Sequence, residues 1–232
     1  LLHGARVVLN DKRRMDDLVE AHNAFADLEQ YHSNLSWVCG EHPLELLDGA
    51  QWVCVSGGVP LDLPLIAEAL HRGIPLTNDS QIFLEAAPCT VVGITGSAGK
   101  TTTTTLVGRM AAVAISTQIQ PGYRQSWVGG NIGSPLIAVV DQMEKTDIAI
   151  MELSSFQLEI MTASPQVAAV LNITPNHLDR HGTMQAYLNA KKQILMNQSD
   201  TDAAILGRDD PGAWSLRDQV KGKLLSFGLT HL

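Results

Sequence analysis

Short apolar runs alternate with stretches of helical periodicity along most of the chain. The runs expected to form strands in the second half are Thr90–Thr95, Ile148–Glu152, Val167–Ile173, Ala203–Leu206 and Leu224–Phe227. Lys100–Ala112 and Met184–Met196 have the character of helices. Strands that are apolar throughout are typical of parallel sheets covered on both faces, so this half is expected to be an α/β domain.

Residues 1–87 follow the same alternation. The predicted strands are Arg6–Leu9, Trp52–Ser56 and Ile74–Leu76, the predicted helices are Asp16–Leu28 and Leu63–Arg72, and Leu1–Ala5 is expected to end an earlier helix. Ala86-Ala87-Pro88 is a plausible boundary. We therefore predict two domains, a Rossmann-like domain over residues 1–87 and a second domain with a mostly parallel sheet over residues 88–232.

The composition is that of a folded, acidic protein. Hydrophobic residues make up 45% of the chain and the formal net charge is −8, which argues against a nucleic-acid partner but allows one nucleotide to bind at a local site. Three widely spaced cysteines, Cys39, Cys54 and Cys89, form no disulfide framework and fit a reducing cytosol. No apolar run reaches the ~18 residues that a membrane span needs. We expect a cytoplasmic protein without membrane insertion.

The segment Gly93–Thr102 (GITGSAGKTT) carries the strongest chemical signal. It follows a predicted strand and opens a predicted helix, which is the context of a phosphate-binding loop, although its spacing from Gly96 is tighter than in the commonest form. Glycines let successive amides point at one anion, and the start of the helix adds a partial positive charge. Lys100 can reach the β- and γ-phosphates, and the Thr101 hydroxyl can ligate Mg²⁺. An ordinary glycine turn is the weaker alternative.

Polar residues follow the next two strands of this half. Glu152 ends an apolar strand, and strand carboxyl ends line the binding crevice of an open α/β sheet, so its carboxylate can hold a metal beside the phosphates. A capping role is the alternative. His177 lies after the following strand, where its imidazole could bind a metal with Asp179 orienting it, or could simply be solvated.

Three further positions have even weaker signals when taken singly. Asn131, in the glycine loop Gly129–Gly133, could present its amide to a polar ligand or could belong to a simple turn. Lys191 lies on a predicted helix, and the sequence alone does not distinguish it from Lys192. Asp11 ends the first strand, a position at which Rossmann folds often contact a ribose or base. A role in forming the turn is equally open.

Taken together, five segments resemble the Mur ligase family. They are TGSAGKTT, GGNIG, ELSSFQLE, NITPNHLDRH and YLNAKK, in this order and spacing, and the resemblance covers nearly the whole chain. ELSSFQL favours the branch that adds D-glutamate, because sister ligases and folylpolyglutamate synthase carry other residues after the equivalent glutamate. The resemblance implies a Rossmann-like UDP-substrate domain over residues 1–87 and an ATP-binding, P-loop-type central domain over residues 88–232.

The resemblance also implies roles for individual residues. Lys100, Glu152, His177 and Lys191 would be catalytic. The ATP-binding loop would consist of Gly96, Ser97, Ala98, Gly99, Lys100, Thr101 and Thr102. The metal ligands would be Thr101, Glu152, His177 and Lys191, the last as a carbamate. Asn131, Ser154 and Gln157 would contact the muramoyl-peptide substrate, and Asp11, Lys12 and Ser56 would lie in its uridine pocket.

The implied reaction joins D-glutamate to UDP-N-acetylmuramoyl-L-alanine in peptidoglycan synthesis. ATP phosphorylates the L-alanine carboxylate, the amine of D-glutamate attacks the acyl phosphate, and phosphate leaves. ATP and Mg²⁺ are the implied cofactors, and a monomer is expected.

The sequence departs from the family pattern in three places. Family members have a strand and a glycine-rich turn that are absent before Leu1, and a third, C-terminal domain that is absent after Leu232. We therefore expect a chain that is incomplete at both ends, binds nucleotide weakly and is inactive as a ligase alone. Gly57 stands where a Ser-Pro-Gly loop has proline, which weakens the expectation for the uridine pocket.

Three alternatives stay open. A P-loop kinase or GTPase would need an aspartate after an apolar strand or a guanine-reading NKxD loop, and neither is present, since Asp147 precedes its strand. A sister ligase with another amino-acid acceptor shares most of the motifs. A non-catalytic nucleotide-binding module would need only the glycine loop.

Overall fold

The computed structural model describes residues 4–25, 33–119 and 122–230. Its contacts group the chain into two units, Leu1–Val53 with Leu61–Pro75, and Cys54–Pro60 with Leu76–Leu232. The domain boundary expected between residues 87 and 88 stays a prediction.

The first unit contains a parallel two-stranded sheet. Strand β1 (Val7–Asp11) pairs with β2 (Leu35–Cys39), with Asp11 opposite Cys39. Its helical segments are η1 (Met15–Leu18), α1 (Val19–Ala24), η3 (Leu44–Leu47) and α2 (Pro64–His71). Two short strands, β3 (Val53–Cys54) and β4 (Leu76–Thr77), pair where the chain passes from one unit to the other.

Some expectations for this unit need correction. Strand β2 was not predicted, and β3 is shorter than the expected strand Trp52–Ser56. The helix expected over Asp16–Leu28 is split into η1 and α1, and its last part lies outside the described residues. Residues 1–3 of the helix end predicted at Leu1–Ala5 also lie outside them. The remainder of that end, Gly4 and Ala5, is not helical.

A six-stranded parallel sheet forms the second unit, in the order β10-β9-β8-β5-β7-β6. Its strands are β5 (Thr90–Thr95), β6 (Ser126–Gly130), β7 (Ile148–Glu152), β8 (Val167–Val170), β9 (Ala203–Gly207) and β10 (Lys223–Phe227). The helices are α3 (Asp79–Ala86), α4 (Lys100–Ser116), α5 (Ser155–Leu158), α6 (Leu178–His181), α7 (Met184–Met196) and α8 (Pro211–Trp214), with η4 (Leu136–Gln142) and η5 (Arg217–Gln219). This is the α/β architecture with a mostly parallel sheet that the sequence predicts.

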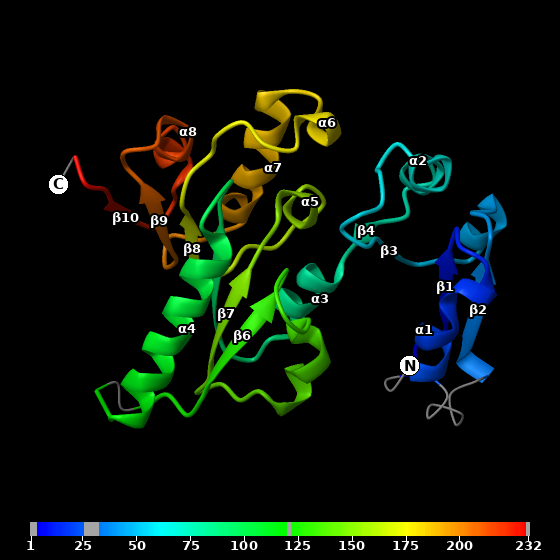
Figure 1. The fold of residues 1–232 in the computed structure, drawn as a ribbon, viewed down its shortest axis with the longest axis horizontal. Coiled ribbons are helices and arrows are strands. Elements are labelled where there is room, and N and C mark those ends of the chain that lie inside the picture. Colours follow the sequence, from blue (N-terminus) through cyan, green and yellow to red (C-terminus); the bar gives the residue numbers. More distant parts are fainter. Residues whose placement is uncertain (1–3, 26–32, 120–121, 231–232) are drawn as a thin grey trace. The chain divides into compact units, whose positions relative to one another are not determined.

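Helices cover the sheet on both faces (Figure 1). On one face, Ala149 and Met151 of β7 belong to a core cluster with Phe83 of α3 and Tyr187 of α7. On the other face, Ile150 packs with residues of α4. Because successive residues of a strand point to opposite faces, strands buried on both sides must be apolar throughout, which explains the continuous runs in the sequence.

Several elements differ from the sequence-based prediction. Strand β8 ends at Val170 rather than Ile173, because the chain then turns to hydrogen-bond the loop after β5. Strand β6 and helix α3 were not predicted. Gly129 and Gly130, expected in a loop, end β6. Gly130 has φ of 102°, and a Cβ there would collide with the Glu152 backbone.

No helix within residues 4–25, 33–119 and 122–230 is long and apolar enough to cross a membrane.

Candidate functional site

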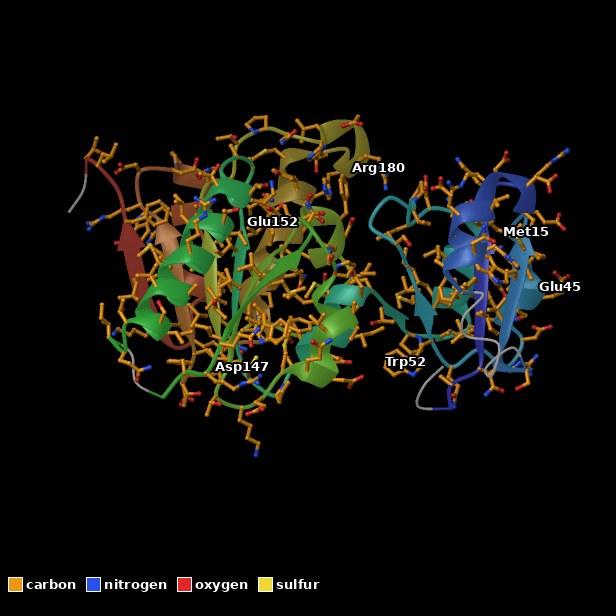
Figure 2. The ribbon with its side chains drawn as sticks, turned by 60° about the horizontal axis from the view of Figure 1, so that its bottom comes forward. Met15, Glu45, Trp52, Asp147, Glu152 and Arg180 are labelled. Atoms are coloured by element: carbon orange, nitrogen blue, oxygen red, sulfur yellow. The ribbon has the colours of Figure 1, made fainter. Side chains whose placement is uncertain are left out.

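The glycine loop lies at the carboxyl edge of the parallel sheet. It connects β5 to α4, and Gly99, with φ of 81°, precedes the first helical residue, Lys100. The register places Glu152 of β7 between Ile94 of β5 and Gly130 of β6, so three strand ends meet beside the loop. Figure 2 shows Glu152 and Asp147 at opposite ends of β7.

The segment after β8 holds the glycine loop in shape. The side-chain amide of Asn172 accepts a hydrogen bond from the Ala98 backbone N–H (2.9 Å) and donates one to the Ala98 carbonyl (3.1 Å). Ser97 donates its N–H to the Asn172 carbonyl and exchanges two hydrogen bonds, both 2.9 Å, between its hydroxyl and the Thr174 backbone. The amides of Ser97 and Ala98, expected in the phosphate cradle, are therefore engaged within the protein. The amides of the first turn of α4 are the ones that a helix leaves available for an anion.

Two lysines converge on one carbonyl of this loop. Lys100 Nζ donates to the Gly96 carbonyl at 3.0 Å, and Lys191 Nζ donates to the same oxygen at 2.9 Å and to Thr95 Oγ1 at 3.3 Å. Lys191 is 1% exposed and its ammonium lies 4.8 Å from the centre of the Tyr187 ring. Burial, and to a smaller degree the Lys100 charge, lowers the pKa of Lys191 to about 7.

Glu152 is a buried carboxylate with neutral partners. It is 1% exposed, and its two oxygens accept hydrogen bonds from Thr101 Oγ1 (2.8 Å) and Asn131 Nδ2 (2.9 Å). In the described part of the chain, no Lys, Arg or His nitrogen lies within salt-bridge distance of these oxygens. Buried carboxylates normally pair with a cation or coordinate a metal, and oxygen ligands suit Mg²⁺. The residues present thus fit a divalent cation, although no cluster of three or more His, Cys, Asp or Glu side chains that could hold a metal occurs in the described ranges.

Ser154 and Gln157, expected to contact substrate, form the cap of α5. Gln157 N–H donates to Ser154 Oγ, and Gln157 Oε1 accepts from both the N–H and the hydroxyl of Ser154. The remaining amide group of Gln157 donates to Ser80 Oγ at 2.8 Å. Such a reciprocal cap satisfies the first amides of a helix, so these two side chains fix the start of α5 directly after Glu152.

His177 lies at the start of α6 in a left-handed conformation, with φ of 51°. Its side chain is exposed and its ring centre lies 5.2 Å from that of Phe156. Asp179, expected to orient it, makes no ion pair with His177. By contrast, His181 is buried against Phe156 and its Nε2 lies 3.0 Å from Ser155 Oγ. Burial lowers the pKa of His181, which favours the neutral ring at neutral pH.

The residues expected in the uridine pocket are divided between the two units. Asp11 and Lys12 belong to the first unit, and Ser56 belongs to the second. Asp11 accepts hydrogen bonds from the Arg13 backbone N–H and Nη2, both at 2.8 Å, and the Arg13 side chain lowers the pKa of Asp11 to about 2. The structure thus brings Lys100, Thr101, Asn131, Glu152 and Lys191 to one edge of the sheet, whereas Asp11 and Lys12 are in a separate unit.

Three residues that shape this edge had no role expected from the sequence. Asn172 and Thr174 hold the glycine loop, and Tyr187 contacts both Ser97 Oγ, at 3.0 Å, and the Lys191 ammonium. The position of Asn172 near the end of the predicted strand Val167–Ile173 was a usable signal, since strand ends meet at one edge. Tyr187 opens the YLNAKK segment, but no role for it was expected from the sequence.

Comparisons with known proteins agree with this geometry. A family model described as the Mur ligase middle domain matches residues 94–231. The chain is 37% identical over 228 residues, 98% of its length and 47% of the relative's, to UDP-N-acetylmuramoylalanine–D-glutamate ligase of Clostridium botulinum (strain Hall). The corresponding protein of Ruminiclostridium cellulolyticum is 37% identical over 97% of this chain and 45% of its own. The chain therefore spans about half the length of the curated relatives it matches.

Among solved structures, the chain resembles a UDP-N-acetylmuramate:L-alanyl-gamma-D-glutamyl-meso-diaminopimelate ligase from Neisseria meningitides. The TM-score is 0.50 at 14% identity, over 85% of this chain and 65% of that one, a likeness of fold alone. Since the family model matches more than half of the residues, the chain belongs to the Mur ligase family.

Proposed function

We propose that this chain is the substrate- and ATP-binding part of an ATP-dependent amide ligase that joins D-glutamate to UDP-N-acetylmuramoyl-L-alanine. The observation that carries the proposal is the convergence of Lys100, Lys191 and the Thr101–Glu152 pair beside one glycine loop. The Lys100 cation, the buried carboxylate and the amides at the start of α4 suit a nucleotide triphosphate with its cation. The names of the relatives and the ELSSFQL segment favour D-glutamate as the acceptor amino acid.

The reaction proceeds through an acyl phosphate. The L-alanine carboxylate attacks the γ-phosphorus of ATP and ADP leaves; the amine of D-glutamate then attacks the acyl carbon, loses a proton, and phosphate leaves. Lys100 moves from the Gly96 carbonyl to the β- and γ-phosphates and stabilises the charge on the transferring group. The protein contributes mainly alignment of the two reactants.

Thr101 and Glu152 would hold Mg²⁺, and His177 with a carbamylated Lys191 would hold a second ion. When bound, Mg²⁺ supplies charge neutralisation at the phosphates. Glu152, which now accepts a neutral hydrogen bond from Thr101, would gain a positively charged partner on holding the cation, and this would offset the cost of its burial.

Lys191 has the chemistry that carbamylation requires. Its pKa of about 7 leaves a large unprotonated fraction at neutral pH, and the free amine can attack CO2. The ammonium first gives one proton to solvent. The free amine then forms the N–C bond as one C=O bond of CO2 becomes C–O⁻, and a second proton leaves the nitrogen, so a buried cation becomes an anion. Intact-mass and peptide analysis in bicarbonate buffer tests this step, with Lys192 as the internal control. Modification of Lys192 in preference to Lys191 would contradict the assignment.

Two measurements test the function. Titration calorimetry with ATP and Mg²⁺ should show binding that Lys100→Ala abolishes. Phosphate release by the chain extended to the full length of its relatives, with ATP, UDP-N-acetylmuramoyl-L-alanine and either D-glutamate, L-lysine or D-alanyl-D-alanine, identifies the acceptor. Release with D-glutamate alone supports the proposal, and release with another acceptor indicates a sister ligase. ATP binding without release for any acceptor indicates a nucleotide-binding module.

A further inference from the structure

Arg180 connects two segments that are distant along the chain. Its Nη1 donates a hydrogen bond to the Gly58 carbonyl at 3.1 Å, across 122 residues of sequence. The guanidinium carbon also lies 5.1 Å from the centre of the Phe156 ring. Figure 2 shows Arg180 projecting from α6. Both partners belong to the same unit as Arg180.

The hydrogen bond from Arg180 is accepted by the turn Ser56–Gly58. The chain is fixed just before this turn, because Val55 is buried and its N–H donates to the Thr77 carbonyl at 2.7 Å. The turn is closed by a hydrogen bond of 2.9 Å from Val59 N–H to the Ser56 carbonyl. Two successive glycines give the backbone of this turn wide conformational freedom. Within the described residues, the bond from Arg180 is the only side-chain hydrogen bond to the turn.

The guanidinium of Arg180 is itself held by an aromatic cluster. The Phe156 ring contacts Arg180, His177 at 5.2 Å and His181 at 5.2 Å, the last in a stacked arrangement with an interplanar angle of 5°. His181 is anchored by Ser155. A cation over an aromatic ring is restricted in orientation, so Arg180 presents its donor to Gly58 with less freedom than an isolated surface arginine has.

We propose that Arg180 is a positioning residue that fixes the Ser56–Gly58 turn for binding of the UDP-linked substrate. The inference rests on the proposed function and on the expectation from the family resemblance that Ser56 contacts the uridine of the substrate. A turn that is already ordered loses less conformational entropy when a ligand binds, so the anchor raises affinity without touching the ligand. His177 directly precedes the same helix, so α6 supports both the turn and the segment that carries this proposed metal ligand.

The test compares three variants with the wild-type chain. Arg180→Met removes the donor and the charge, and Arg180→Lys keeps both on a shorter side chain. Arg217→Met is the matched control, because Arg217 Nη1 also donates to a backbone carbonyl, that of Trp214, and its guanidinium lies 5.8 Å from the centre of the Trp214 ring. Calorimetry gives the affinity for UDP-N-acetylmuramoyl-L-alanine and, separately, for ATP with Mg²⁺. Hydrogen exchange followed by mass spectrometry reports on a peptide covering residues 54–60.

Arg180→Met should weaken substrate binding about five- to tenfold, the loss expected for one hydrogen bond, and leave ATP affinity unchanged. Hydrogen exchange in residues 54–60 should become faster in the same variant. Arg180→Lys should restore part of the substrate affinity and part of the protection from exchange, and Arg217→Met should change neither quantity. Unchanged exchange in Arg180→Met overturns the inference, as does an equal loss of substrate and ATP binding, which indicates general unfolding. If the wild-type chain binds no UDP-linked substrate, the proposed function fails at this step, and the exchange measurement still decides whether Arg180 holds the turn.

Discussion

Replacing Asn172 with aspartate should weaken nucleotide binding while leaving the protein folded. The wild-type amide bridges the backbone of Ala98 with hydrogen bonds of 2.9 and 3.1 Å. Aspartate keeps the acceptor for the Ala98 N–H but replaces the donor with a carboxylate oxygen that faces the Ala98 carbonyl. It also adds a negative charge beside the loop that is proposed to bind phosphates. One net hydrogen bond contributes about 1 kcal/mol, and the unfavourable oxygen pair adds up to about 2 kcal/mol more.

The affinity for ATP with Mg²⁺ should therefore fall between about 5-fold and 150-fold, measured by titration calorimetry. Asn189→Asp is the matched control, because it makes the same charge change at an exposed asparagine of α7 that accepts a hydrogen bond from Gln185. Circular dichroism should show both variants folded. Equal ATP affinity of the two variants would refute the argument that Asn172 shapes the loop.

Three other predictions concern stability. Asp147 is 0% exposed, and hydrogen bonds from Arg124 lower the pKa of the Asp147 carboxyl from 3.8 to about 2. The Asp147 charge therefore stabilises the fold above pH 3.8, and Asp147→Asn should lower the free energy of unfolding by about 2 kcal/mol at pH 7. Urea titrations should show this difference between variant and wild type shrinking as the pH falls toward 2. Gly130→Ala should lower the melting temperature more than Gly122→Ala, because both glycines have positive φ but only the Cβ at 130 would meet neighbouring backbone; equal shifts would contradict this. The fold lowers the pKa of Lys191 from 10.5 to about 7, so between these pH values the unfolded chain binds more protons than the folded chain. In CO2-free buffer, the free energy of unfolding should therefore rise with pH in that range. Urea titrations of Lys191→Met should lack this rise.

The central strands could be predicted from the sequence because each is buried on both faces. Thr90–Thr95 and Ile148–Glu152 have continuous apolar runs, and their observed bounds coincide with the predicted ones. Strand β6 could not be recognised in the same way, since it lies at the edge of the sheet and ends in two glycines. Its pairing with β7, rather than its own residues, makes it a strand. The Asn78 cap of α3, which accepts from Gln81 N–H, was a local signal that could have been used.

For the candidate site, the sequence predicted which residue types gather at the sheet edge but not their partners. Asn131 binds Glu152 because these two groups meet only once the strands are aligned. The cap between Ser154 and Gln157 is local, and its Ser-x-x-Gln spacing was a signal that could have been used. The difference between Lys191 and Lys192 likewise depends on which face of α7 packs on the sheet: Lys191 is buried, whereas Lys192 is partly exposed. Hydrogen-bond partners and burial are properties of the packed fold, and residues of one type can differ in both.

The hydrogen bonds that shape the nucleotide loop have a consequence for the timing of folding. Ser97 and Thr174 are 77 residues apart, and Lys191 and Gly96 are 95 residues apart. Contacts between distant residues must overcome the entropy of closing the intervening chain, and domains are synthesised from the N-terminus. A nascent chain that has just completed α4 thus contains the sequence of the loop without the segments that order it. It can form the loop only after Thr174 has left the ribosome, and the two lysines share the Gly96 carbonyl only after Lys191 has followed.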